Sequence, residues 1–590
     1  MCRYTTGVWK TLLMAGMMGL IPMDFARGVE VKRAEWGFNQ NATLGEFNQL
    51  LIYVHNETRE PFRGRFSLQK ELALSLVDAR IVSEEVFLPP ESGRWITFYP
   101  YITSNHQDWV VTWGRGRSQR HTIDAPPLND GEVIYLWVDE VDRPPEGLIA
   151  FEADKFPTNV AVTRGLYAVV MDRVPEWDAA RRRAFRDWLY LGGRLHLLEN
   201  PGVPMRFTEE LVELNNPNGE FRIGAGRVTR VPLPRSAITR ELVMGWGPPE
   251  VPQKDEPFNQ FGYSNLESSI FNELRSGVTP RHNWNLIYGA TALFLLLVGP
   301  VNWWLSRRRV VNYRGSLGIL CVAIGLFGFG FFKIGQAGYG EEAVVDKFAY
   351  ARSLGDSWDV TQFVNIFVTS GDRYTIQHEM GQNLYATAQE YEGVRGVLRQ
   401  GTGESMSLEV EIPIYSSRPF VHHGRLAQNP FQMGVQSWPV ESEGFEGLVL
   451  RVGDGFPTEI EDVWAIRGDK MTPLLRRTAE NRFVPSVNAG LEHKTVMASR
   501  VKQRQTELTS FSGPPIDPVS ELLESKLVTP NQKRNQPITE PDRVIVLVLA
   551  PAPQELAMPP GSFGIERGTV LYRIDVFRDQ TINEEKGATP

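Results

Sequence analysis

Four carboxylates occupy positions at which a cation-binding cluster can form. Asp139, Asp142, Asp172 and Glu199 follow short apolar runs with the composition of buried strands. In open α/β sheets, ligands bind beyond the carboxyl ends of the strands, and carboxylate oxygens there can hold a divalent cation. Asp139, Asp172 and Glu199 are therefore weak candidates for metal-assisted hydrolysis. An aspartate after a strand also caps turns and helices through its side chain, and this structural role competes with the catalytic one.

The histidines give little support for catalysis. His196 lies inside an apolar run (RLHLL), where a lone histidine is more often structural than catalytic. His422 and His423 are adjacent in a segment that we expect to be turn-like (SSRPFVHHGR). Neighbouring residues of an extended chain point to opposite faces, so the pair does not predict a joint metal site.

The chain also lacks the short motifs of several enzyme classes. It has no HExxH, no paired cysteines with metal-ligand spacing, no Gly-x-Ser-x-Gly elbow and no phosphate loop ending in Gly-Lys-Ser/Thr. We therefore predict neither a cofactor nor a bound metal.

The strand-end carboxylates depend on the elements of residues 131–235. Residues 133–138 (VIYLWV), 166–171 (LYAVVM) and 194–198 (RLHLL) are apolar runs typical of buried strands. Between the last two, residues 177–191 carry an apolar stripe at helical spacing, and Gly192 and Gly193 follow it. Such strands alternating with a helix predict a parallel, doubly wound sheet of flavodoxin-like type.

Three segments carry a family resemblance. Residues 166–201 (LYAVVMDRVPEWDAARRRAFRDWLYLGGRLHLLENP) resemble the class I glutamine amidotransferase-like segment of bacterial membrane proteins of unassigned function. Residues 224–231 (GAGRVTRV) resemble their Gly-x-Gly-x-Val strand, and residues 299–309 (GPVNWWLSRRR) resemble the GPxN signature of their first membrane helix. The resemblance covers about residues 130–335. It implies an extracytoplasmic amidotransferase-like domain followed by a transmembrane hairpin.

The same resemblance also argues against amidotransferase chemistry. True amidotransferases of this class place a cysteine nucleophile at a Gly-x-Cys-x-Gly turn between a strand and a helix. The only cysteines of this chain are Cys2 and Cys321, and neither lies in the α/β region. The resemblance therefore implies a domain without the amidotransferase nucleophile.

The predicted hairpin divides the chain. Residues 284–305 contain no charged residue, and residues 315–334 contain only Lys333 near their end. About 20 apolar residues span a hydrocarbon core of about 30 Å as a helix, so both runs predict transmembrane helices. The loop at 306–314 has no acidic residue and four basic ones, Arg307, Arg308, Arg309 and Arg314. Basic loops are retained in the cytoplasm, so we expect both flanks to lie outside.

The flanks complete the predicted domain organisation. Residues 1–28 have the basic start, apolar stretch and small residues of a secretory signal peptide, although retention as a third anchor stays open. Residues 29–130 alternate in short runs that predict an immunoglobulin-like β-sandwich. Residues 236–283 form a predicted linker with a short helix near 268–274. Residues 335–590 predict a second β-rich domain, interrupted near 500–542 by a polar stretch with one helix at 518–527.

Composition narrows the function. The 590 residues carry a net charge of −8 with acids and bases interspersed, so we expect no nucleic-acid partner. We predict a membrane-anchored binding or scaffold protein of the bacterial inner membrane, with most of the chain periplasmic. Its partners would be the lipid bilayer and other envelope proteins. The alternative is an extracytoplasmic metal-assisted hydrolase that uses the strand-end carboxylates.

Overall fold

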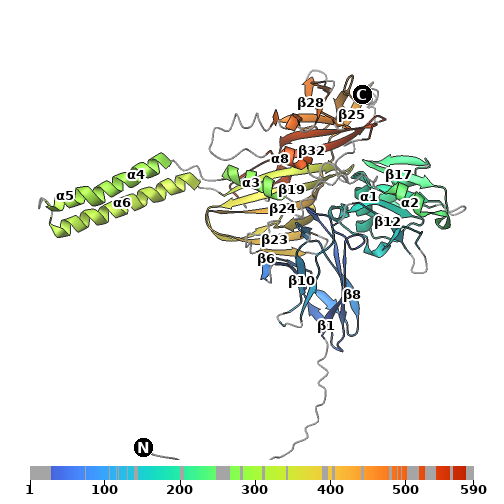
Figure 1. Ribbon diagram of the computed structural model, residues 1–590, viewed down its shortest axis with the longest axis horizontal. Helices are drawn as coiled ribbons and strands as arrows, with labels where there is room; N and C mark the ends of the chain where they lie inside the picture. The colour runs from blue at the N-terminus through green and yellow to red at the C-terminus, as the bar shows by residue number, and fades with distance from the viewer. Residues whose placement is uncertain are drawn as a thin grey trace, which may run out of the picture.

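The structure is a computed structural model, and Figure 1 shows its arrangement. It describes residues 28–72, 75–104, 106–114, 116, 119–128, 131–138, 144–199, 205–247, 266–278, 284–307, 312–339, 343–387, 396–400, 405–439, 444–468, 470–477, 481–487, 490–492, 495–497, 499–500, 517–524, 540–558 and 563–579. The predicted signal peptide therefore lies outside the described residues, apart from Gly28. The described chain is multidomain and mostly β-sheet, with two long apolar helices.

The N-terminal module is β-rich, as the short alternating runs predicted. Its small sheet consists of β1 (Val29–Trp36), β3 (Leu50–Asn56) and β8 (Gly93–Phe98). Two short pairs are β2 (Glu46–Phe47) with β9 (Tyr101–Ile102), and β4 (Phe62–Gly64) with β7 (Val86–Leu88). Its other sheet has seven strands in the order β11 (Arg120–Ile123), β10 (Asp108–Thr112), β5 (Ser67–Leu72), β6 (Ser75–Val82), β22 (Gly396–Gln400), β23 (Met406–Ile412) and β20 (Asp372–Ile376).

This seven-stranded sheet joins chain segments from both sides of the hairpin. Strand β6 pairs in parallel with β22, so that Ile81 lies opposite Leu398. The predicted sandwich of residues 29–130 is therefore not a closed unit. The free edge of β6 carries backbone N–H and C=O groups that need partners, and strands from the distant chain provide them.

The α/β module contains a six-stranded sheet. Its order is β13 (Ile149–Glu152), β12 (Glu132–Trp137), β14 (Leu166–Met171), β15 (Arg194–Leu198), β17 (Gly226–Val231) and β16 (Glu220–Ile223). The first five strands are parallel, and β16 is antiparallel to β17. The parallel pairing predicted from the continuous apolar runs is thus confirmed.

Helix α1 (Ala179–Tyr190) covers one face of this sheet with Phe185, Trp188 and Leu189. The Asp178 carboxylate caps its start by accepting from the Arg181 backbone N–H at 2.8 Å. Gly192 follows its end with φ +112°, a conformation that favours glycine. The predicted helix of residues 177–191 is confirmed to within two residues at its start and one at its end.

The segment predicted as a linker, residues 236–283, contains two packed helices. Helix α2 (Arg240–Trp246) buries Val243 and Trp246 against the other face of the six-stranded sheet. Helix α3 (Leu266–Val278) includes the helix predicted near 268–274. The linker prediction was wrong for these residues because α2 contributes only two buried side chains, too few to give a visible apolar stripe.

The chain after the hairpin forms a large sheet. Its path is β21 (Gly381–Ala386), β24 (Ser416–Leu426), β19 (Trp358–Val368), β18 (Val344–Ser353), β32 (Ile565–Phe577), β31 (Arg543–Pro551), β27 (Asp462–Arg467), β28 (Lys470–Arg477), β29 (Arg482–Pro485), β26 (Val449–Val452) and β25 (Met433–Ser437), with β30 (Leu491–Glu492) paired to β28. Helix α8 (Pro518–Glu524) lies where residues 518–527 predicted one. Most of the polar stretch near 500–542 lies outside the described residues.

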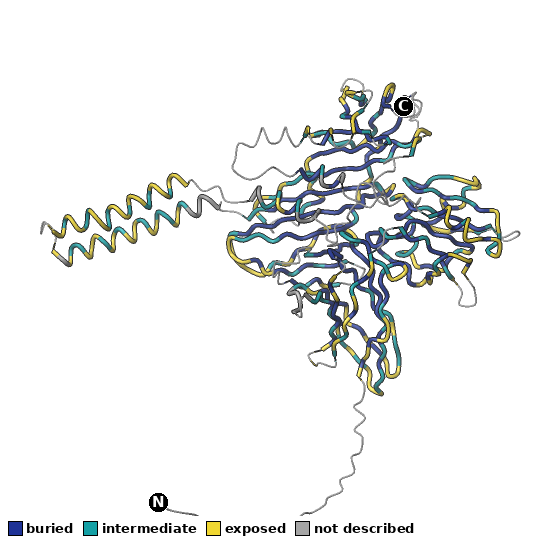
Figure 2. The backbone as a smooth tube through the Cα atoms, viewed as in Figure 1, coloured by how far each residue is buried: buried dark blue, intermediate teal, exposed yellow. Residues whose placement is uncertain are grey.

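The hairpin consists of α4 (Trp284–Leu296), a π-helical turn η6 (Leu297–Val301), α5 (Asn302–Arg307) and α6 (Tyr313–Tyr339). Two spans, Trp284–Arg307 and Arg314–Ile334, are long and apolar enough to cross a membrane, and neither is buried. Figure 2 shows their exposed surfaces projecting from the body. Pro300 lies in the π turn, where the missing N–H and the bulk of its ring favour a wider turn. The Ser316 hydroxyl donates to Asn302 Oδ1 across the hairpin at 2.7 Å.

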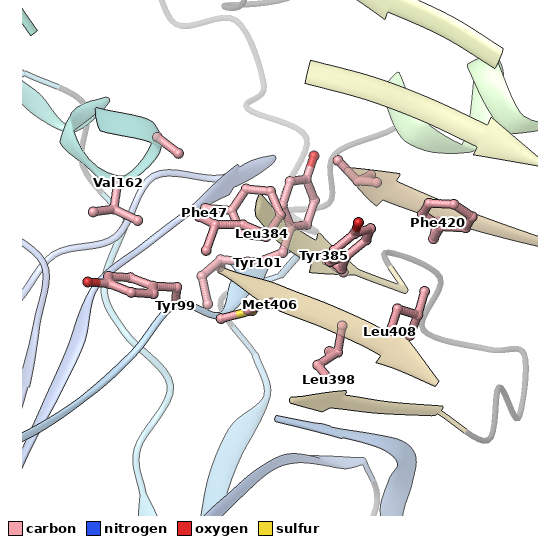
Figure 3. Close-up of a cluster of buried hydrophobic side chains, with 14 of the residues drawn as sticks. Phe47, Tyr99, Tyr101, Val162, Leu384, Tyr385, Leu398, Met406, Leu408 and Phe420 are labelled. Atoms are coloured by element: carbon pink, nitrogen blue, oxygen red, sulfur yellow. The ribbon is translucent and has the colours of Figure 1, made fainter. Parts of the chain in front are cut away.

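Both ends of the hairpin return to one folded body. Before it, α3 packs on β18 and β19, with the Phe271 and Phe363 ring centroids 6.0 Å apart. After it, β18 lies inside the large sheet. Figure 3 shows a cluster of buried side chains to which all three modules contribute, including Phe47 and Tyr101, Val162, and Leu384 and Phe420. The described flanks of the hairpin therefore share a hydrophobic core.

Candidate functional site

The carboxyl end of β14 carries a small polar group centred on Asp172. The Tyr135 hydroxyl of β12 donates to Asp172 Oδ1 at 2.9 Å. Arg235 Nη1 lies 3.8 Å from Asp172 Oδ2 and 3.4 Å from the Tyr135 oxygen. Burial raises the pKa of Tyr135 to about 12, so this hydroxyl remains a donor at neutral pH. The group presents a charged arginine above a buried tyrosine and carboxylate.

Among the described strand-end candidates, Glu199 does not join Asp172 in a cluster. Glu199 follows β15, and its carboxylate binds Arg230 of β17 at 2.9 Å. Asp139 and Asp142 lie outside the described residues. Within the described ranges, no group of three or more His, Cys, Asp or Glu side chains could hold a metal ion. Asp172 and Glu199 are each paired with an arginine.

His196 faces helix α2 and has a structural environment. Its ring stacks on Trp246, with centroids 4.6 Å apart and planes at 18°. Neither ring nitrogen has a hydrogen-bond partner. Burial lowers the pKa of His196 to about 4, so the ring is neutral at physiological pH. The interpretation of this histidine as structural agrees with its surroundings.

His422 and His423 lie in the middle of strand β24, so the turn-like prediction for this segment was wrong. Strand pairing on both sides of β24 holds the segment extended. The two side chains point to opposite faces, as alternation requires. The ring of His422 stacks on His378 with centroids 3.8 Å apart, and its Nε2 lies 2.8 Å from Asn383 Oδ1.

His423 belongs to a different group that has the residue types of a nucleophilic triad. Its Nε2 lies 3.2 Å from Asp359 Oδ1, and its Nδ1 lies 3.2 Å from the Thr361 hydroxyl. All three residues are buried, so the hydroxyl has no access to a substrate. Asp359 Oδ2 also accepts from Arg352 at 2.6 Å and from Arg164 at 3.2 Å. This geometry describes a buried ion network rather than a catalytic triad.

The charges around Asp359 determine its ionisation. Burial opposes the charged form, but His423, Arg352 and Arg164 favour it more strongly and hold the pKa of Asp359 below its usual value. Arg164 comes from the α/β module, whereas the others come from the large sheet. The network therefore links two modules.

Two further groups of ion pairs link the same modules. Near the end of α1, Asp187 binds Arg425, and Arg186 Nη2 lies 3.1 Å from Asp356. In the second group, Glu540 accepts from three arginines of the α/β sheet, Arg194, Arg222 and Arg227, at 3.5, 3.0 and 3.3 Å. Burial raises the pKa of Asp187 to about 6 despite its arginine partners.

All three groups use the same edge of the six-stranded sheet. Arg164 precedes β14, and Arg194 and Arg227 lie at the starts of β15 and β17. Helix α1 runs back between two parallel strands, so its C-terminal half also lies at the amino edge. The ion pairs between the α/β module and the large sheet thus involve the amino edge, opposite the carboxyl edge with Asp172.

Comparisons with known proteins find only distant similarity. No family model and no curated protein matches the chain. A cycloisomaltooligosaccharide glucanotransferase from Paenibacillus sp. is 11% identical, covers 68% of this chain and 70% of its own, and has a TM-score of 0.16. A β-D-mannosidase from Dictyoglomus thermophilum is 9% identical, with coverages of 80% and 76% and a TM-score of 0.15. These scores carry no argument about fold or function.

Proposed function

We propose that this protein is a membrane-anchored binding or scaffold protein of the bacterial cell envelope. Its α/β module would be a non-catalytic platform related to the amidotransferase-like domains that the sequence resembles. The two apolar helices would anchor it in the inner membrane, and the folded body would lie in the periplasm. Other envelope proteins are the partners that we propose.

The observation that carries this proposal is which edge of the α/β sheet is attached to the rest of the protein and which edge is not. Its amino edge is joined to the large sheet by the ion pairs of Asp359, Asp187 and Glu540. Its carboxyl edge, with Asp172 and Arg235, is the edge where ligands bind in such sheets. Figure 1 shows the hairpin and this module on opposite sides of the body. This arrangement supports a rigid platform held away from the membrane.

The absence of a cysteine in the α/β region favours binding over amidotransferase chemistry. Cys321 lies in α6, and Cys2 precedes the described residues. Both carboxylate oxygens of Asp172 already have partners, since Oδ1 accepts from Tyr135 and Oδ2 faces Arg235. We therefore propose recognition of an anionic or hydrogen-bonding surface by Arg235 and its neighbours.

Site-specific cross-linking tests the platform. A photoreactive residue replacing Val138, which is exposed at the end of β12, should form one discrete adduct in membranes. The same residue at Leu475, exposed on β28, is the matched control and should not. Adding Arg235→Ala should lower the Val138 adduct about tenfold, which corresponds to about 1.4 kcal/mol of binding. An adduct unaffected by Arg235→Ala would refute recognition at this edge.

Membrane topology gives a second prediction. Because both flanks share a core, they must lie on one side of a membrane, and the basic loop favours the cytoplasm for the hairpin tip. Reporter fusions at Tyr313 and after the last residue should therefore report opposite compartments. As a control, a fusion after Val278 should agree with the C-terminal one. Agreement between the Tyr313 and C-terminal fusions would contradict the anchoring model.

A further inference from the structure

The strand ends next to the hairpin expose large apolar side chains. Four residues, 340–343, separate the end of α6 at Tyr339 from the start of β18 at Val344. A chain of this length spans at most about 18 Å. The start of β18 therefore lies close to the outer end of the apolar hairpin.

Strand register brings three further strand ends to the same place. Val344 lies opposite Phe367 of β19 on one side and opposite Ile565 of β32 on the other. Val368, at the end of β19, lies opposite Ser416, the first residue of β24. Neighbouring strands are about 4.8 Å apart, so these ends share one border of the sheet.

Three large side chains, two isoleucines and a tyrosine, are exposed at this border. Ile414 is 58% exposed, Tyr415 is 38% exposed and Ile565 is 46% exposed. We call these three residues the hairpin-side rim. Tyr415 has φ +53°, a conformation that glycine or asparagine adopts more readily than an aromatic residue. Figure 2 shows an exposed turn at the border of the body that faces the hairpin.

The position of the rim next to the hairpin favours the lipid bilayer as its binding partner. The exposed surface of α4 and α6 is apolar over both spans and ends beside the rim. A bilayer that covers the helices would reach its headgroup region near the rim. Tyrosine suits that region because its ring is apolar and its hydroxyl is polar, and the two isoleucines offer apolar side chains to the adjacent hydrocarbon.

We propose that the hairpin-side rim, Ile414, Tyr415 and Ile565, contacts the lipid bilayer and fixes the orientation of the folded body on the membrane. This inference rests on the proposed membrane anchoring. The body is then held by these three side chains as well as by the hairpin, so that the α/β module stays directed away from the lipid.

The experiment uses the full chain with Cys2→Ser and Cys321→Ser, reconstituted in phosphatidylethanolamine and phosphatidylglycerol vesicles. Single cysteines at Ile414, Leu326 and Leu475 carry an environment-sensitive fluorophore. Leu326 lies exposed on α6 and reports insertion of the hairpin. Leu475 is exposed on β28, which β32, β31 and β27 separate from β18 in the large sheet. Spin-labelled lipids serve as the quencher.

We expect a blue shift and lipid quenching at position 414, as at 326, and neither at 475. Quenching at 326 with a water-like, unquenched probe at 414 would overturn the rim contact and leave the anchoring intact. A blue shift at 414 without lipid quenching would place the probe against protein rather than lipid and overturn the proposal. A water-like probe at 326 would overturn the anchoring and the rim contact together.

Discussion

Replacing Asp359 by alanine should destabilise the folded body by about 3–5 kcal/mol, because the change leaves buried positive charges without their partner. Asp359 is 2% exposed, and its carboxylate binds Arg352, Arg164 and His423. The measurement is chemical unfolding of the detergent-solubilised chain, followed by tryptophan fluorescence.

A matched control distinguishes the loss of this buried network from the loss of an exposed ion pair. Glu409 binds Arg399 at 2.6 Å on the exposed surface of β23 and β22. Glu409→Ala should cost at most about 1 kcal/mol, since exposed pairs are screened by water. If Asp359→Ala costs no more than Glu409→Ala, the network around Asp359 does not stabilise the fold.

A double-mutant cycle measures the contribution between modules. Arg164 is the α/β residue of this network, so Arg164→Met tests its coupling to Asp359. We expect a coupling energy of about 1–3 kcal/mol between Arg164→Met and Asp359→Ala. Purely additive effects would show that the α/β module is not fixed through this pair.

Some of this architecture follows from local sequence. Helix α1 was predictable because its apolar stripe and the following glycines are contained in about fifteen residues of sequence. The helical spacing of this stripe also places position 187, three residues after Ala184, on the buried face of the helix. The sequence therefore contained a signal that Asp187 is buried. The hairpin was predictable for the same reason, because its signal is the length of two uncharged runs.

The pairing between distant segments was not predictable in this way. The sequence of strand β6 indicates an extended segment, but nothing in it specifies β22 as the neighbouring strand. Likewise, Arg164 and Asp359 look like ordinary surface charges in the sequence, and only the packing of two modules buries them together. Of the candidate site, Asp172 was identified from its place at a strand end, whereas Tyr135 and Arg235 were missed because their contact with it is tertiary.

Acidification from pH 7 to pH 5 should lower the free energy of unfolding by roughly 4 kcal/mol. The slope is about 1.4 kcal/mol per pH unit for each proton that the unfolded chain binds and the folded chain does not. Burial lowers the pKa of His196 to about 4 and that of His378 to about 3, and it lowers the pKa of His422 as well. Lys347 lies near His378 and His422 and acts in the same direction. Below about pH 6.5, the unfolded chain binds these protons and the folded chain does not, so acid favours unfolding.

Asp187 partly opposes this effect. Its pKa is about 6 in the folded state, so below that pH the folded chain binds a proton that the unfolded chain does not, until the usual aspartate range is reached. The three histidines outnumber this one carboxyl, and the net slope keeps its sign between about pH 6.5 and pH 4. Asp575, with a pKa of about 2, adds to the loss only below the usual aspartate range.

His196→Phe isolates one of the three contributions. Phenylalanine can keep the stacking on Trp246, and the histidine nitrogens that it removes have no hydrogen-bond partner. The variant should therefore be about as stable as the natural chain at pH 7, and its loss of stability per pH unit near pH 5 should fall by about half. Urea midpoints at pH 7, 6 and 5 measure both slopes. Equal slopes for the two proteins would show that His196 takes up no proton on unfolding, whereas a halved slope would establish that this buried histidine makes the fold acid-sensitive.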